Sequence, residues 1–186
     1  MRRAFRMIAL ASAMLSLGTS QTTPAAQTVD LEAMERFMHS STVRVVWSQE
    51  IARFDTDRGH SVITALVAED GRQNPRRMRG IGIELLQGRV SDVVYTEEGL
   101  LERLRGALNE ITTGLPIFRA RASRGCFGSG VFWQQTGHAF SASACLRPEW
   151  SGLSVGTGAA MFEFTGLDAM AFTAAIDKAM NELKLH

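Results

Sequence analysis

Residues 125–146 read Gly-Cys-Phe-Gly-Ser-Gly-Val-Phe-Trp-Gln-Gln-Thr-Gly-His-Ala-Phe-Ser-Ala-Ser-Ala-Cys-Leu and predict a β-hairpin that carries both cysteines of the chain. The turn signal is the Gln-Gln-Thr-Gly stretch, with glycine at its last position. If Gln135 and Thr136 form the loop, Cys126 lies directly opposite Cys145. Directly opposed residues of two antiparallel strands bring their Cβ atoms close enough for a disulfide. The stretch therefore predicts a hairpin closed by a disulfide between Cys126 and Cys145.

This register also gives the hairpin two different faces. A sheet that is apolar on one side predicts helices on that side, and a lighter cover or water on the other. A bulge at Gly128 or Gly130 would shift the register by one residue and weaken the prediction. Without a bulge, the apolar face carries Phe127, Val131, Trp133, His138, Phe140, Ala142 and Ala144, with Trp133 opposite His138, and the small, polar face carries Cys126, Gly128, Gly130, Ser141, Ser143 and Cys145.

Residues 1–26 have the three-part pattern of a secretory signal peptide. Three arginines precede a run of apolar and small residues at 7–18, and a small, polar stretch follows. Cleavage is expected after Ala26 or after Ser20. The apolar run is too short to span a bilayer, so we expect no integral membrane anchor after cleavage, and a retained anchor is the alternative. The expected location is the periplasm or the outside of the cell.

Residues 27–186 are long enough for one exported domain with its own core. Removing the three arginines of the leader from 20 basic residues, against 19 acidic ones, leaves a net charge of about −2. This charge argues against nucleic acid as a partner. Two cysteines in an exported chain favour one disulfide over two free buried thiols. A disulfide between Cys126 and Cys145 would close a loop of about 20 residues and contribute about 3 kcal/mol to the stability of the fold.

The rest of the chain alternates strand-like and helix-like patterns. A short helix is expected at residues 30–40, with Asp30 as its N-cap. Thr96 is expected to cap a helix that has Leu100, Leu104, Leu108 and Ile111 on its buried side and ends at Gly114 and Pro116. A last helix after residues 165–168 buries Phe172, Ile176, Ala179, Met180 and Leu183. Strands are expected at 42–54, 61–68, 78–86, 90–95, 117–123 and 152–164, besides the two of the cysteine hairpin.

These elements predict an α+β fold: a single domain with a curved, mostly antiparallel sheet of about seven strands. The two main helices are expected to pack on one face of this sheet. Similar short sequences in both helices, at 107–111 and 179–183, are compatible with an internal ββα-type repeat. Two ordinary amphipathic helices after strands are the favoured explanation.

Several patterns could carry chemistry, and each has a structural explanation as its alternative. Three Gly-x-Gly pairs in strands, at 80/82, 128/130 and 156/158, suggest a flat face for a ligand, but close backbone packing or bulges explain them better. The stretch 55–60 resembles the start of a calcium loop, but its sixth position is not glycine, so a hairpin turn is favoured. Four arginines could hold an anion, although a solvated loop is favoured: Arg72, Arg76, Arg77 and Arg79.

No catalytic or metal site emerges from the histidines. His39, His60, His138 and His186 lack the spacing of metal ligands, and no cofactor is predicted. A dyad of Ser129 with His138 lacks a third partner. We therefore expect a non-enzymatic binding module of the cell envelope, whose partner is an envelope protein or a small ligand. The alternative is a small hydrolase-like enzyme that uses Ser and His of the hairpin region.

Overall fold

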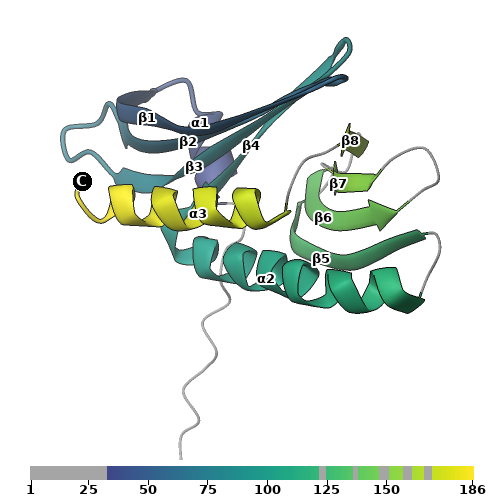
Figure 1. The fold of residues 1–186 in the computed structure, drawn as a ribbon. Helices are drawn as coiled ribbons and strands as arrows, with labels where there is room; N and C mark the ends of the chain where they lie inside the picture. Colours follow the sequence, from purple (N-terminus) through teal and green to yellow (C-terminus); the bar gives the residue numbers. More distant parts are fainter. Residues whose placement is uncertain (1–32, 122–124, 136–137, 147–150, 157–160, 166–168) are drawn as a thin grey trace, which may run out of the picture.

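An antiparallel sheet of four strands in the order β1-β2-β3-β4 forms the first half of the molecule. The computed structural model describes residues 33–121, 125–135, 138–146, 151–156, 161–165 and 169–186, with side chains described for 33–114 and 170–186. A short helix, α1, precedes the sheet, and two long helices lie along one of its faces (Figure 1). The bounds are α1 Ala33–Met38, β1 Val43–Thr56, β2 Gly59–Asp70, β3 Arg77–Gln87, β4 Val90–Glu97, α2 Glu98–Arg121 and α3 Ala169–Leu183.

A second antiparallel sheet has the strand order β5-β6-β7-β8. The prediction of a single sheet of about seven strands is therefore wrong, while the α+β class is confirmed. The expected long strand at 152–164 is two strands that pair with each other, because the chain reverses after Gly156, which pairs with Met161. The bounds are β5 Gly125–Gln135, β6 His138–Leu146, β7 Ser151–Gly156 and β8 Met161–Thr165.

Helix α2 passes through the position where the sequence predicts its end. It continues past Gly114 and Pro116 to Arg121, so the predicted strand at 117–123 does not form. Proline removes one backbone donor but does not prevent a helix from continuing when packing supports it. That packing comes from the second sheet, because α2 contacts β5 and β6 as well as β3 and β4 (Figure 1). The length of α2 is thus a consequence of tertiary contacts.

The main core lies between the first sheet and the pair α2 and α3. Ile63, Ile81, Ile83 and Leu85 of the sheet have no exposed surface. The predicted buried positions of both helices belong to this core except Leu100, which is buried outside this cluster. Phe172 of α3 stacks on Phe54 of β1 with ring centroids 5.5 Å apart. Each strand places alternate residues on the helix side, so the remaining positions point to the opposite face. This alternation leaves a second face for α1 and for solvent.

Two bulges interrupt β1, which is an edge strand of the first sheet. They lie between Val45 and Trp47 and between Glu50 and Ala52. At the second one, the Lys178 ammonium of α3 donates to the carbonyl oxygen of Ile51 over 3.4 Å. Bulges and charges on an edge strand hinder the addition of another strand. The β1 edge is therefore protected against edge-to-edge pairing.

The backbone pairs Cys126 with Cys145, as the sequence predicts. The turn is different, because Gln135 pairs with His138, so the loop is not formed by Gln135 and Thr136. The side chains of both cysteines lie outside the described side chains. The disulfide between them stays a prediction.

The pairing at the tip of this hairpin differs from the predicted register. Trp133 pairs with Phe140, so the predicted pairing of Trp133 with His138 is wrong. Two bulges in β5, between Phe127 and Gly130 and between Val131 and Trp133, each add one residue to β5 relative to β6. Each bulge shifts the register by one residue. Together they compensate for the displaced turn, which is why the cysteine pairing nevertheless agrees.

The start of α2 also differs from its prediction. Thr96 belongs to β4 and does not cap the helix; its hydroxyl is buried and has no hydrogen-bond partner among the residues that the structure describes. Glu98 occupies the first turn of α2, where an acidic side chain is favourable. The order of elements is four strands and a helix, twice over. The predicted cap Asp30 and the signal peptide lie outside the described residues.

Candidate binding surface

One face of the first sheet carries polar side chains and lies opposite α2 and α3. On β2, Ile63 and Ala65 belong to the helix-side core, so the residues between and beside them point the other way. Opposed residues of neighbouring strands share a face, which extends the assignment to β1 and β3. We call this surface the open face; it carries Ser48, Glu50, Arg53, Asp55, His60, Val62, Thr64, Gly82, Glu84 and Leu86.

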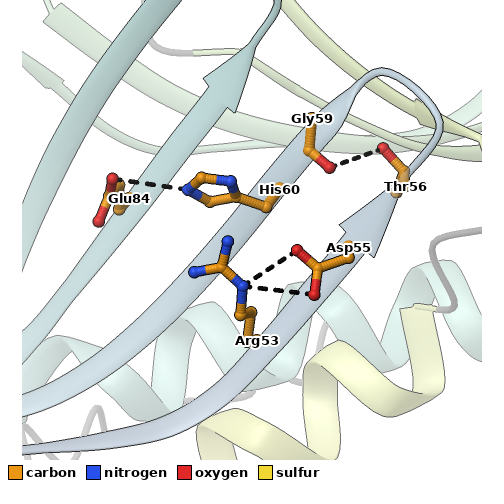
Figure 2. Close-up of polar contacts among 6 residues, drawn as sticks. All are labelled: Arg53, Asp55, Thr56, Gly59, His60 and Glu84. Carbon is orange, nitrogen blue, oxygen red and sulfur yellow. Dashed lines mark hydrogen bonds and ion pairs between the residues drawn. The ribbon is translucent and has the colours of Figure 1, made fainter.

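Two ion pairs lie on the open face near the turn that joins β1 to β2 (Figure 2). Nε of Arg53 donates to both carboxylate oxygens of Asp55, at 3.0 and 3.3 Å. Nε2 of His60 lies 3.6 Å from Oε1 of Glu84. The His60 side chain is 19% exposed, against 68% for Asp55. Within the described part of the chain, His60 thus has a carboxylate partner but no hydroxyl partner, so no Ser–His–acid arrangement is assembled on this face.

The loop that resembles a calcium site is a hairpin turn. The Thr56 hydroxyl donates to the carbonyl oxygen of Gly59 over 3.1 Å and accepts from the Arg58 N–H at 3.3 Å (Figure 2). A Cβ on Gly59 would lie 1.8 Å from the Leu86 carbonyl oxygen, so close approach of β3 requires glycine here. Among the described residues, no three His, Cys, Asp or Glu side chains are placed to hold a metal ion. The turn geometry accounts for the sequence of this loop.

Helix α1 covers the other end of the open face through a buried carboxylate. Glu35 is 8% exposed, and its Oε2 accepts the backbone N–H of Tyr95 over 2.7 Å. Its Oε1 lies 2.9 Å from Nε2 of His39, whose ring meets the Tyr95 ring edge-on. Burial raises the pKa of the Tyr95 phenol above its usual 10.0, and the charges of Glu35 and Glu84 raise it further. The sequence singles out His39 but gives no sign that Glu35 reaches β4, sixty residues away.

The pair Gly80 and Gly82 on β3 has a packing explanation. A Cβ on Gly80 would lie 2.1 Å from the Thr96 carbonyl oxygen. A Cβ on Gly82 would lie 3.1 Å from the Tyr95 ring, which occupies the space over this glycine. Neither glycine therefore offers a free platform to a ligand. The side-chain surroundings of the other two Gly-x-Gly pairs lie outside the described side chains, as do those of Ser129 and His138.

Of the four arginines in and beside the β2–β3 loop, three contact a carboxylate, namely Arg72, Arg77 and Arg79. The fourth, Arg76, contacts an aromatic ring. Nη2 of Arg79 lies 2.6 Å from Glu98, and its Nη1 donates to the Leu183 carbonyl oxygen at the end of α3. Nε of Arg77 lies 3.8 Å from Glu69. Arg72 contacts Asp70 at 3.5 Å, with its side chain 78% exposed. Arg76 instead lies over the Phe37 ring, with 5.8 Å between its Cζ and the ring centroid.

Two surface hollows flank Arg76. The larger, about 470 Å³, is also lined by Arg77 and Arg79, but Glu97 and Glu98 share it and supply negative charge. His186 lines it too, and its ring stacks on Trp47 at 4.0 Å. The smaller hollow, about 240 Å³, lies between α1 and the loop that joins β2 to β3. It is lined by Ala33, Arg36, Phe37, Ser40, Thr42, Val43, Asp70, Arg72 and Arg76.

Comparison with known proteins gives no relative from which a function could be transferred. No protein-family model matches the chain, and no curated protein matches it significantly. None of the helices in the described residues is long and apolar enough to cross a membrane.

Proposed function

We propose that the protein is an exported, non-enzymatic binding module of the cell envelope, periplasmic or secreted, and that it holds its partner on the open face. The observation that carries this proposal is the unequal cover of the first sheet. Two long helices bury one face, whereas the apolar cluster on the other is built from α1 and the strands alone, at one end. Beyond α1, the β1 side chains of this face are exposed, namely Ser48, Glu50, Arg53 and Asp55, whereas those of β2 and β3 are partly or fully buried.

The chemistry of the open face suits recognition of a polar surface. Its charged residues include Glu50, Arg53, Asp55 and Glu84, and both signs lie within a few residues of each other. Mixed charges at a rim select a partner with the complementary arrangement and contribute more to specificity than to affinity. A rigid sheet holds such groups in fixed positions, which lowers the entropic cost of binding. We infer an envelope protein or a small ligand as the partner, and no nucleic acid.

The hydrolase alternative has one supporting observation, the contact between His60 and Glu84. A carboxylate beside an imidazole can orient a general base, but catalysis also needs a nucleophile within hydrogen-bond reach. The serine considered for that role, Ser129, has no described side chain. We therefore place binding ahead of hydrolysis and make turnover an outcome of the test.

The test is native purification of the full chain from the periplasmic fraction, with chemical cross-linking and mass spectrometry. Asp55→Arg reverses a charge on the open face, and Glu110→Arg makes the same change on the exposed side of α2. We expect Asp55→Arg to lower recovery of the cross-linked partner at least about fivefold, and Glu110→Arg to leave it unchanged. The proposal fails if nothing co-purifies while esterase, peptidase or phosphatase assays show turnover that His60→Ala abolishes.

A further inference from the structure

The smaller hollow between α1 and the β2–β3 loop concentrates positive charge. Arg72 and Arg76 of the loop line it together with Arg36 of α1, and Asp70 is the one carboxylate among the lining residues that the structure describes. In the larger hollow two carboxylates stand among the arginines, so the charge there is more nearly balanced. An excess of guanidinium groups around a concave surface favours an anionic ligand. The smaller hollow is therefore the better candidate for an anion site.

Both carboxylate oxygens of Asp70 contact residues of the β2–β3 loop and hold the loop in shape. Asp70 is 8% exposed, and its Oδ1 accepts the backbone N–H of Arg76 over 2.8 Å. Its backbone N–H donates in turn to the Arg76 carbonyl oxygen over 3.1 Å, which closes the loop on itself. Its Oδ2 lies 3.5 Å from Nε of Arg72. One buried carboxylate thus fixes where two arginines, Arg72 and Arg76, leave the loop.

Arg76 is the cation that the protein leaves available. Its guanidinium lies over the Phe37 ring and makes no ion pair with a carboxylate of the described residues. Its neighbour Arg77 faces Glu69, and Arg79 is held by Glu98. An aromatic ring under a guanidinium orients it without satisfying its N–H donors. Those donors can therefore reach a ligand in the hollow.

Two hydroxyl groups complete the lining. Oγ of Ser40 and Oγ1 of Thr42 lie 3.2 Å apart, on the turn that leads from α1 to β1. The Gly71 N–H donates to the Thr42 carbonyl oxygen over 2.9 Å, which ties this turn to the β2–β3 loop. Hydroxyl donors beside arginines suit a group with several oxygen acceptors and more than one negative charge. A phosphate group has these properties.

We propose that this hollow binds the phosphate group of a small phosphomonoester or of an anionic lipid, through Arg72 and Arg76 with the hydroxyls of Ser40 and Thr42. The inference rests on the proposed binding function and gives it a ligand class. The hollow lies at the α1 end, and the ion pairs of Figure 2 lie at the other end of the same sheet. The two surfaces can therefore be tested independently.

The test is isothermal titration of the purified full-length protein with glycerol 3-phosphate, and co-sedimentation with phosphatidylglycerol vesicles against phosphatidylcholine vesicles. We expect saturable binding of at least one anionic probe. Arg76→Gln and Arg72→Gln should each weaken it at least about tenfold. Arg77→Gln removes the same charge from the first residue of β3, next to the loop but outside the lining of this hollow, and should change the affinity less than about twofold. Binding of glycerol 3-phosphate alone assigns a soluble ligand, and recruitment to phosphatidylglycerol assigns the lipid.

The proposal is overturned if neither probe binds saturably, or if Arg77→Gln weakens binding as much as Arg76→Gln. The second result would mean that the probes respond to net charge alone. Circular dichroism of each variant checks the fold, and the exposed Arg72 supplies a second variant if loss of the contact with Phe37 destabilises Arg76→Gln. If the phosphate site fails while Asp55→Arg still abolishes partner recovery, the binding function stands without this ligand.

Discussion

The backbone N–H of Tyr95 donates to Oε2 of Glu35 over 2.7 Å, so that a carboxylate of α1 closes part of the outer edge of β4. An unpaired N–H at a sheet edge is ordinarily satisfied by water or by another strand. Here a nearly buried side chain takes that place, and Met34 and Phe37 hold α1 over the sheet on either side of it. This contact limits the open face at one end.

Replacing Glu35 should lower the free energy of unfolding. Glu35→Ala removes the acceptor and leaves a buried N–H unsatisfied, which costs about 1–3 kcal/mol. Glu35→Gln keeps an acceptor oxygen and should cost less. Urea denaturation measures the difference, with Glu110→Ala on exposed α2 as a control that should stay within about 0.5 kcal/mol. Equal effects of Glu35→Ala and Glu110→Ala would show that the hydrogen bond does not stabilise the fold.

Tyr95 is the single tyrosine of the chain, so its ionisation can be followed directly by ultraviolet absorbance. Burial, then Glu35 and Glu84, raise its pKa in the folded protein above 10.0. The protonated phenol is therefore favoured by folding. Its contribution to stability is fully present below about pH 10 and is lost as pH rises through the folded-state pKa. Tyr95→Phe should remove this part of the alkaline destabilisation, and a phenol that titrates at or below pH 10 in the folded protein would contradict the assignment.

Gly80 and Gly106 are predicted to respond to alanine in opposite directions. A Cβ at Gly80 would lie 2.1 Å from the Thr96 carbonyl oxygen, so Gly80→Ala should destabilise the protein by about 1–3 kcal/mol. Gly106 lies on the exposed side of α2 with nothing within 4 Å of a Cβ. Gly106→Ala should therefore stabilise by up to about 1 kcal/mol. Thermal unfolding of both variants measures these two changes in stability. If Gly80→Ala does not destabilise the protein, β3 and β4 must lie farther apart at this position than the structure shows.

The pairing of Cys126 with Cys145 predicts a disulfide in the exported protein. Thiol titration of denatured, unreduced protein should detect no free thiol, and two after reduction. The double variant Cys126→Ser with Cys145→Ser should lose about 3 kcal/mol of stability. Two free thiols in oxidised, exported protein would exclude the bond.

The first sheet could be predicted because its strands are rich in β-branched and other apolar residues and are separated by turns and one polar loop. The buried positions of α2 and α3 follow from helical spacing in the same way, and Leu104 and Ile176 lie in the core as expected. Such local periodicity is present in the sequence whatever the rest of the chain does. It does not tell how many strands join one sheet, which is why a single sheet was expected where two form.

The features that could not be predicted depend on contacts between distant residues. Gly114 and Pro116 signal a helix end, yet packing against β5 carries α2 past both. Bulges in β5 leave no pattern that distinguishes them from regular strand, so the register at Trp133 was wrong while that at Cys126 was right. The smaller hollow was foreseen only as a group of arginines. Which of them is free of carboxylates is decided by Asp70 and Phe37 from other parts of the chain.

Site-specific photocross-linking in living cells tests most directly whether the partner binds at the open face. A photoreactive residue at Glu50, exposed on the open face, is compared with one at Asn109, exposed on α2. We expect a discrete cross-linked species from position 50, absent from position 109 and reduced by Asp55→Arg. Cross-links of equal yield from both positions, or from position 109 alone, would contradict it.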